Sequence, residues 1–331
     1  MPGSYAPFPA ALVRRERLSP GFLRLTFADP ALARLGTACL DQRVKLVFAA
    51  AEARAALLGA PDWFAWWRGL AEAQRPPMRT YTVRAVRPHA AEVDIDFAVH
   101  GALGPASSFA LEAPLGSELV LVGPVQGAAG ADRDGIAWHP GAAHTVLLAG
   151  DETAAPAIGN ILAALPATAR GAALIEVAEA AEALDFPHPD GVEVAWLPRG
   201  AAHGDAHGGA AARGTGLTDA ALRWYDDFAA GRAAARAGAA GAAAGAGAYE
   251  ELDEISADGS ALLWDQSDLG EQGDVGVQGV VGDDPGAGLF TWVAADAATV
   301  ARLRRALRRE RGLPRSGTSF MGYWRPGYQE S

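Results

Sequence analysis

Cysteine is almost absent from this chain of 331 residues, because Cys39 is the only one. A single cysteine excludes an internal disulfide, and it excludes an iron–sulfur cluster or a structural zinc site built from several thiolates. Any redox chemistry in this chain therefore needs an organic cofactor, or a metal that arrives with the substrate.

Long hydrophobic runs are also lacking. The longest uncharged stretch near the middle, residues 153–169, contains Pro156, Asn160 and Pro166, which is typical of a helix of a water-soluble protein and not of a membrane span. Arg14 follows an uncharged, proline-containing start, whereas a signal peptide places positive charge before its apolar run. We expect a cytoplasmic protein with no membrane partner.

Lysine is as scarce as cysteine, because Lys45 is the only one. The net charge of −11 comes from one segment: residues 250–284 hold 11 acidic residues and no basic one, which leaves 28 acidic against 28 basic residues elsewhere. Residues 302–315 hold seven arginines. One arginine-rich helix in a chain of isoelectric point about 5.1 gives little support for nucleic-acid binding, so we expect none.

Short strands with turn residues between them fill the N-terminal part of the chain, residues 11–125. Such a pattern is typical of an antiparallel barrel. Residues 61–74 interrupt it as a helical or loop excursion. The strand-like segments are "FLRLTF" (22–27), "RVKLVF" (43–48), "VDIDFAVH" (93–100) and "SELVLVG" (117–123).

The pattern changes near residue 144, where a short apolar run precedes a helix with apolar residues at i, i+3, i+4 and i+7. Thr153 is the expected N-cap of this helix, with Pro156 in its first turn. A last helix starts near Asp296 and stops at Gly312. Strands that alternate with helices predict a parallel sheet. The further strand-like runs are residues 172–178, 192–198 and 288–294.

Residues 200–287 fit neither pattern. "LTDAALRWYDDF" (217–228) is compatible with a helix, but residues 229–248 are an Ala/Gly stretch in which five glycines oppose one. With the acidic segment that follows, the composition predicts a mobile, low-complexity acidic insertion at about 200–287. "HGDAH" (203–207) offers two histidines without a third ligand nearby, so we expect no metal site.

The stretch "MRTYTVR" (78–84) places three different binding groups within four residues. Side chains alternate along a strand, so Arg79 and Tyr81 share one face while Thr82 turns to the other. Tyr and Thr favour strands, so an ordinary strand explains the motif taken alone. A flavin site also explains it, with Arg79 on a pyrophosphate, Tyr81 stacked on the ring and the Thr82 hydroxyl bonded to it.

A glycine-rich turn after the next strand favours the flavin site. "DFAVHGALGPASSFA" (96–110) runs from a strand through Gly101 and Gly104 into small residues. Small residues let the backbone approach a ligand closely, and Ser107 or Ser108 is expected to cap the short helix that follows, leaving amides for a phosphate. The alternative is a strand followed by a plain glycine turn.

Five motifs occur in order along the chain. They are "RTYTVR", "DIDFAVHG", "GPASSFA", "LLAGDETAAPAI" and "GYWRPG". With these motifs the chain resembles the siderophore-interacting proteins, or ferric-siderophore reductases, a branch of the ferredoxin-reductase-like flavoproteins. The resemblance covers residues 11–200 and 288–327 and implies two domains. These are an antiparallel Greek-key β-barrel for FAD at 1–142 and an α/β parallel-sheet domain for the nicotinamide nucleotide at 143–331.

The resemblance also implies roles for single residues, each of which has a structural alternative as a strand, cap or tail residue. Lys45 and Arg325 would offer positive charge to the chelate, and Arg199 would meet the dinucleotide phosphate. Either Tyr323 or Trp324 would cover the flavin face. The cofactor positions are Arg79, Tyr81 and Thr82 with Val99 and His100 on the flavin, Gly104, Pro105, Ala106 and Ser107 on the pyrophosphate, and Asp151, Glu152, Thr153 and Ala154 at the flavin–nicotinamide junction.

The activity implied by the resemblance is the reduction of a ferric siderophore by NAD(P)H through FAD. We also expect the protein to be a monomer. Two alternatives stay open: a reductase of the same fold that acts on free flavin or a partner protein, and a siderophore-binding protein without catalysis. Two positions depart from the family pattern, since Ser108 stands where arginine is frequent and Asp296 stands where glutamate is usual.

Overall fold

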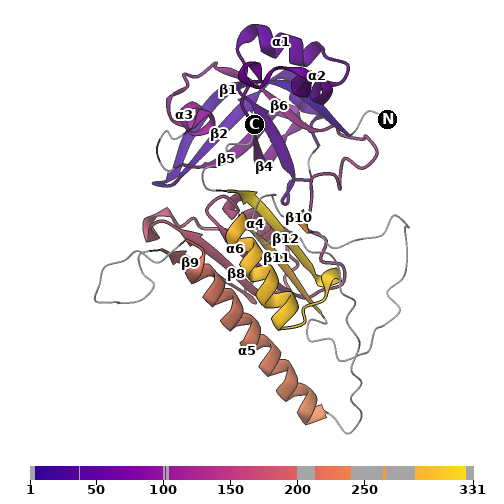
Figure 1. Cartoon of the computed structure of the whole chain (residues 1–331), viewed down its shortest axis with the longest axis vertical. Helices are drawn as coiled ribbons and strands as arrows, with labels where there is room; N and C mark the ends of the chain where they lie inside the picture. Colours follow the sequence, from indigo (N-terminus) through magenta and orange to yellow (C-terminus); the bar gives the residue numbers. More distant parts are fainter. Residues whose placement is uncertain are drawn as a thin grey trace.

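The structure is a computed structural model that describes residues 4–36, 38–99, 101, 104–199, 213–239, 264–265 and 288–325. It contains a β-barrel followed by an α/β domain, with the barrel stacked on one end of the α/β domain (Figure 1). The predicted two-domain fold class is confirmed. No helix within the described ranges has the length and apolarity needed to cross a membrane.

The barrel closes in the order β1-β2-β5-β4-β3-β6, and all its neighbouring strands are antiparallel. Alternate residues of each strand point inward, and Phe27, Ile95 and Phe97 in the barrel core are fully buried. Helix α3, Pro105–Glu112, adds Ala106 and Ala110 to this core. The strands are β1 (Tyr5–Ser19), β2 (Phe22–Ala28), β3 (Arg43–Val47), β4 (Met78–Arg87), β5 (Glu92–Ala98) and β6 (Glu118–Pro124).

A second apolar cluster covers the outer surface of the barrel, where α1 (Ala51–Gly59) and α2 (Trp63–Gly69) pack. Both helices lie at the barrel end far from the α/β domain (Figure 1). The excursion predicted at 61–74 is therefore helical, as α2 and a 3₁₀ turn, Glu72–Gln74. The cluster contains Val47, Met78, Val120 and Val122 of the strands with Leu57 and Trp67 of the helices.

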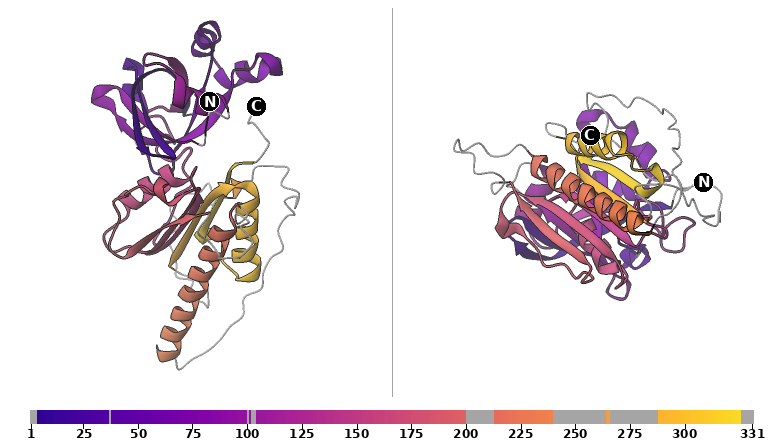
Figure 2. Two further views of the ribbon diagram at one scale, coloured as in Figure 1. Left: turned by 90° about the vertical axis from the view of Figure 1, so that its left-hand side faces the viewer. Right: turned by 90° about the horizontal axis from the view of Figure 1, so that it is seen from below.

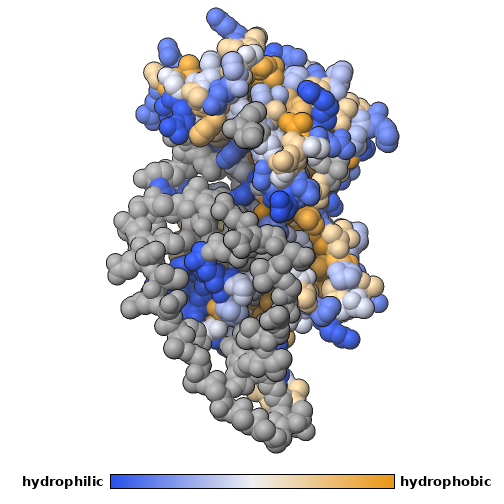
Figure 3. All heavy atoms as spheres, turned by 90° about the vertical axis from the view of Figure 1, so that its right-hand side faces the viewer, coloured by the Kyte–Doolittle hydropathy of each residue, from blue (hydrophilic) through white to orange (hydrophobic). Residues whose placement is uncertain are grey.

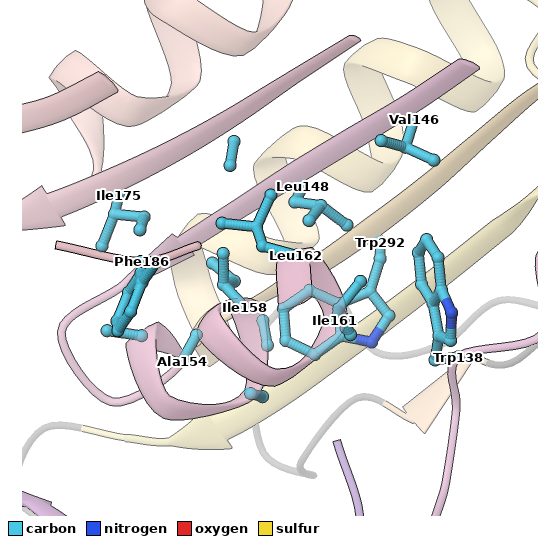
Figure 4. Close-up of a cluster of buried hydrophobic side chains, with 14 of the residues drawn as sticks. Trp138, Val146, Leu148, Ala154, Ile158, Ile161, Leu162, Ile175, Phe186 and Trp292 are labelled. Carbon is cyan, nitrogen blue, oxygen red and sulfur yellow. The ribbon is translucent and has the colours of Figure 1, made fainter. Parts of the chain in front are cut away.

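The second domain is one sheet in the order β10-β12-β11-β7-β8-β9, parallel except where β10 pairs with β12. One face is covered by α4 (Ala155–Ala164), whose Ile158 and Ile161 pack on Leu148 and Trp292 (Figure 4). The strands are β7 (Thr145–Asp151), β8 (Arg170–Val177), β9 (Val192–Pro198), β10 (Trp264–Asp265), β11 (Leu289–Asp296) and β12 (Thr318–Trp324).

The other face of the sheet is covered by α5 (Thr215–Ala239) and α6 (Ala297–Arg304), which a π-helical turn extends to Glu310. Asp296 caps α6 by accepting hydrogen bonds from two backbone amides, so the predicted start of the last helix is confirmed. Its predicted end is confirmed too, because Gly312 has φ 71° directly after the helical turns.

Helix α5 confirms the helix expected at 217–228 and corrects the expectation for the Ala/Gly stretch that follows it, as far as residue 239. Leu217, Ala221 and Tyr225 are buried against the sheet, and the helix continues through residues 229–239 before projecting past the sheet (Figure 2). Only two of the five glycines of the Ala/Gly stretch, Gly231 and Gly238, fall inside it, so the helix propensity of alanine prevails. Residues 200–212, 240–263 and 266–287, including "HGDAH", lie outside the described residues.

Two predicted helix caps are wrong. Thr153 does not cap α4, because its amide and hydroxyl donate to Asp151 in the preceding turn and the N-cap is Ala154. Neither Ser107 nor Ser108 caps α3, because the helix starts earlier, at Pro105. Proline is pre-organised for a first helical turn, and this moves the start upstream of both serines.

Candidate functional site

Strand β4 presents different residues on its two faces. Tyr81 packs on Phe97 with ring centroids 4.2 Å apart, and Arg79 donates to the Met78 carbonyl at 2.8 Å. Burial raises the pKa of Tyr81, and the charge of the nearby Arg79 lowers it in part. Thr82 lies on the opposite face. The structure therefore brings Arg79 and Tyr81 together on one side of the strand, as the alternation predicts.

Helix α3 and Tyr81 pack against the same barrel core, to which α3 contributes Ala106 and Ala110. Gly104 is the N-cap, no side chain caps the first turn, and a Cβ at Gly104 would meet nothing within 4 Å. Val99 is buried and donates its amide to the Gly21 carbonyl at 2.8 Å. The first turn of α3 therefore has no side-chain cap among the described residues. His100 lies outside the described residues.

The outer face of β3 and β4 carries polar groups that lead towards the sheet domain. Lys45 Nζ donates to Thr80 Oγ1 at 2.6 Å. Tyr323, near the end of β12, packs edge-on against Trp292 with ring centroids 6.3 Å apart. Burial raises the pKa of Tyr323, the charge of Asp41 adds to the rise, and the charge of Arg43 and the neighbouring Thr82 oppose it. Arg325, half-buried, follows β12 directly.

Asp151 ends β7 and gathers donors from three elements. Its carboxylate accepts from the Thr153 amide at 2.9 Å, from the Asp296 amide at 3.1 Å and from Trp324 Nε1 at 2.8 Å. Burial raises the pKa of Asp151 to about 6, and the charge of Glu152 adds to the rise. One carboxylate therefore holds the ends of β7, β11 and β12 together and fixes the Trp324 ring.

Glu152 and Glu176 form ion pairs with two arginine side chains at this edge of the sheet. Arg199 Nη1 lies 2.8 Å from Glu152 and 3.6 Å from Glu176, and Arg213 Nη1 lies 2.7 Å from Glu152. The Arg213 guanidinium also sits 5.0 Å from the centre of the Trp324 ring. Arg199, predicted to meet a dinucleotide phosphate, is thus ion-paired within the chain.

The sequence interpretation missed Glu176 and Arg213. Glu176 accepts from the Gly214 amide at 2.9 Å and so fixes the N-terminal end of α5. Glu176 could have been identified from the sequence, because it is a carboxylate near the end of an apolar parallel strand. The carboxyl ends of such strands contact ligands and helices. Arg213 gives no comparable signal, since its neighbours are small residues of the insertion.

The barrel and the sheet domain share buried hydrogen bonds beside this site. Trp292 Nε1 of β11 donates to Asp41 at 2.9 Å, and Asp41 precedes β3. Asn160 of α4 donates to the carbonyls of Leu40 and Val83, both at 2.8 Å. Burial raises the pKa of Asp41, and the bond from Trp292 opposes the rise. These contacts fix the β4 face relative to the carboxyl edge of the sheet.

Two curated relatives match part of the chain. An uncharacterized protein of Mycobacterium tuberculosis is 41% identical over 160 residues, 48% of this chain and 53% of the relative. The ferric vibriobactin reductase ViuB of Vibrio cholerae is 39% identical over 127 residues, 38% of this chain and 43% of the relative. The chain thus spans about half the length of the curated relatives it matches.

Solved structures extend the likeness to the whole chain. A siderophore utilization protein from T. fusca is 26% identical with a TM-score of 0.63, covering 100% of this chain and 97% of that one. The siderophore-interacting protein SipS of Aeromonas hydrophila is 23% identical with a TM-score of 0.59, covering 99% and 94%, and it supports the fold alone. A ferredoxin reductase of carbazole 1,9a-dioxygenase, 12% identical, shares the fold at a TM-score of 0.53, covering 97% and 70%.

Family models cover both domains. The siderophore-interacting FAD-binding domain matches residues 11–129, and the siderophore-interacting protein model matches residues 143–327. The family resemblance of the five sequence motifs is thereby confirmed. Because the second model alone matches more than half of the chain, the chain belongs to the siderophore-interacting protein family.

Proposed function

We propose that this protein reduces ferric siderophores with electrons from NAD(P)H passed through a bound FAD, and that it releases the iron as Fe(II). The observation that carries the proposal is the meeting of β4 with the end of β12, where Thr82 lies beside Tyr323. This contact joins the barrel strand of the FAD-binding domain to the carboxyl edge of a parallel sheet, where α/β folds bind ligands. The similarity to ViuB, which is named as a ferric vibriobactin reductase, also supports the proposed reduction of ferric siderophores.

The residues of the barrel fit FAD. Arg79 offers a planar guanidinium, and the uncapped first turn of α3 offers amides beside open space at Gly104, a donor set that suits a pyrophosphate. Tyr81 offers an aromatic ring on the same face of β4. We assign Gly104, Pro105, Ala106 and Ser107 to the pyrophosphate, and Thr82, Val99 and His100 to the ring system.

The carboxyl edge of the sheet is the proposed place of the electron donor. Asp151, Glu152, Thr153 and Ala154 form the first βα loop there, and Arg199 supplies positive charge beside it. Tyr323 and Trp324 stand between this loop and β4, since Tyr323 lies beside Thr82 and Trp324 donates to Asp151. These rings exclude water from the junction and hold its two sides at a fixed separation.

The chelate site needs positive charge, because the chain carries a net charge of −11 and many ferric chelates are anionic. We assign this task to Lys45 and Arg325. Hard oxygen donors hold Fe(III) far more tightly than Fe(II), so one electron releases the metal. When bound, FAD supplies the conversion from a two-electron donor to a one-electron acceptor. No side chain needs to act as a general acid or base.

The proposal is tested on the purified protein. We expect a yellow protein that releases FAD and not FMN, whose flavin absorbance is bleached anaerobically by NADH or NADPH. Addition of a ferric siderophore should restore the absorbance and produce Fe(II), while free flavin or a ferredoxin should not replace the siderophore. A protein that stays colourless after reconstitution with FAD would contradict the proposal. A yellow protein that reduces only free flavin would assign it to another acceptor.

A further inference from the structure

The parallel strands of the second domain have the spatial order of a dinucleotide-binding sheet. They lie in the order β9-β8-β7-β11-β12, in which β7, β8 and β9 are the first, second and third along the chain. In such sheets an acidic residue roughly 20 residues after the first βα turn lies at the adenosine ribose of the ligand. Glu176, near the end of β8, follows the loop that ends at Ala154 by a similar separation. The ribose is therefore expected beside Glu176.

Glu176 fills the anion position at the start of α5. The Gly214 amide donates to both of its carboxylate oxygens, at 2.9 and 3.1 Å, and the Leu217 amide donates at 3.4 Å. The first amides of a helix suit a phosphate, but here a side chain of the protein accepts from them. Glu176 is 2% exposed, so a phosphate beside it would meet a negative charge that water and salt screen weakly.

The arginines at this edge are already balanced by carboxylates. Glu152 pairs with Arg199 at 2.8 Å and with Arg213 at 2.7 Å, and Arg199 also lies 3.6 Å from Glu176. The described charged groups linked by contacts here are more often negative than positive, so the edge offers no surplus of positive charge to a further phosphate. They are the carboxylates of Asp151, Glu152, Glu176 and Asp296 and the guanidiniums of Arg199, Arg213 and Arg302.

A pyrophosphate can still be held at this edge. Arg199 and Arg213 keep 15% and 34% of their side-chain surface open to solvent, and no side chain caps the first turn of α4. NADH and NADPH share the pyrophosphate, so these groups do not distinguish the two donors. NADPH differs by a 2′-phosphate on the adenosine ribose, which adds nearly two negative charges. The discrimination therefore depends on the charge beside the ribose.

We propose that Glu176, assisted by Glu152, makes this protein select NADH over NADPH as its electron donor. This inference rests on the proposed function for the presence of a nicotinamide dinucleotide at the carboxyl edge, and it adds which of the two is used. Proteins commonly gain specificity by placing an unfavourable charge against the wrong ligand.

A protein electron carrier is the alternative donor, and it would need a docking surface. Large exposed apolar areas mark such surfaces. Over the barrel face seen in Figure 3, hydrophilic and hydrophobic residues are interspersed instead. The polar, ion-paired carboxyl edge of the sheet suits a dinucleotide better than this face suits a protein.

The test uses ADP-ribose and 2′-phospho-ADP-ribose, which differ only in the phosphate that distinguishes NADH from NADPH. Neither probe contains nicotinamide, so neither transfers electrons. Binding to the FAD-loaded protein is measured by calorimetry. We expect the unchanged protein to bind ADP-ribose roughly tenfold or more tightly, because like charges meet in the other complex. Glu176→Gln removes the charge and keeps the size, so it should reduce this ratio by roughly tenfold.

A second variant and a matched control complete the test. Glu152→Gln releases Arg199 and Arg213 from their shared carboxylate and should reduce the ratio as well. Glu193→Gln is the control, because Glu193 is exposed near the start of β9, at the opposite edge of the sheet, and should leave the ratio unchanged.

Three results would overturn the selection of NADH by Glu176. They are equal binding of the two probes by the unchanged protein, binding of neither probe, and a ratio that changes as much in Glu193→Gln as in Glu176→Gln. The proposed function is tested separately, since a flavin that neither NADH nor NADPH bleaches would refute that function and leave the measured binding ratio standing.

Discussion

Asp151 shows how one buried carboxylate can organise the junction of two domains. It holds the amide of Asp296 and the indole of Trp324, so it sets where the C-terminal aromatic residues lie. Charged acceptors of this kind are stronger than neutral ones, but burial works against the ionised form. The residue is therefore both a positioning group and a source of pH dependence.

The first prediction follows from the raised pKa of Asp151, about 6. The folded protein binds this proton more tightly than the unfolded chain, so the stability due to Asp151 is complete below about pH 4 and is lost as pH rises through about 6. In Asp151→Asn this loss is absent. The free energy of unfolding of the unchanged protein, relative to the variant, should fall by up to about 3 kcal/mol from pH 4 to pH 7 in urea titrations.

Asp226→Asn is the control for this pH profile, because the contribution of Asp226 to the free energy of unfolding changes with pH in the opposite direction. A hydrogen bond from Arg311 lowers the pKa of Asp226, so the stability that Asp226 contributes is lost as pH falls. A pH-independent difference between the unchanged protein and Asp151→Asn would show that the Asp151 carboxyl titrates as in the unfolded chain.

Arg79 carries the second prediction. The guanidinium lies on the Tyr81 face of β4, and a charge-assisted hydrogen bond to a phosphate contributes roughly 1.5–3 kcal/mol. Arg79→Ala should therefore weaken FAD retention by that amount, measured by fluorescence during dilution of the holoprotein. Arg17→Ala is the matched control, because Arg17 is exposed on β1 and donates to the nearby Pro20 carbonyl. Equal FAD affinity in both variants would remove Arg79 from the cofactor site.

At the scale of elements, α5 combines a packed half and an exposed half. Leu217 is fully buried, whereas Ala234 is exposed on the part that projects past the sheet. Leu217→Ala should lower the free energy of unfolding by roughly 2–5 kcal/mol, the cost of a cavity in a core. Ala234→Gly should cost no more than about 1 kcal/mol, the difference in helix propensity. Urea unfolding of both variants measures this contrast, and similar costs would show that the whole helix is packed.

The elements that sequence reasoning identified are those with a regular apolar pattern. The sequences of β2 and β5 alternate, that of β3 does so in part, and β6 is a short, more fully apolar run. The helix beginning at Ala297 has its cap, its buried face and its terminal glycine in the chain itself. Local spacing was sufficient there because each signal is read within one element.

Strand β12 and the cap of α4 could not be predicted from local spacing. Thr318 and Ser319 read as tail residues, yet both are fully buried, because Ser319 donates to the distant Ala137 carbonyl and Thr318 accepts from Arg308. Thr153 is a residue type that often caps helices, but its amide and its hydroxyl both donate to Asp151. In each case a tertiary partner decides the structure, and the partner is invisible in a local window.

The residues of the candidate site also fall into two groups, those recognised from local spacing and those that depend on tertiary partners. Arg79, Tyr81 and the Gly104 turn were found because their spacing in the strand and turn is itself the signal. Asp41 and Asn160 were missed, since each is a single polar residue whose partners come from the other domain. A buried polar group between domains can be recognised only when the two surfaces are seen together.

At the scale of the whole molecule, the barrel and the sheet domain should unfold as one unit. Asn160 joins them by donating to the part-buried carbonyl of Leu40 and the buried carbonyl of Val83, and both lose this donor when the amide is removed. Each buried unpaired group costs about 1–3 kcal/mol. Asn160→Ala should therefore lower the opening free energy of the junction by roughly 2–5 kcal/mol and separate the two domains energetically.

Native-state hydrogen exchange measures this separation. In the unchanged protein, peptides from β5 and from β7 should share one opening free energy, since both belong to a single cooperative unit. In Asn160→Ala the two values should diverge. Asp226→Ala removes an exposed ion pair with Arg311 inside the sheet domain and should leave the two peptides coincident. Coincident values in Asn160→Ala would mean that Asp41 and Trp292, with the apolar contacts around them, suffice to couple the domains.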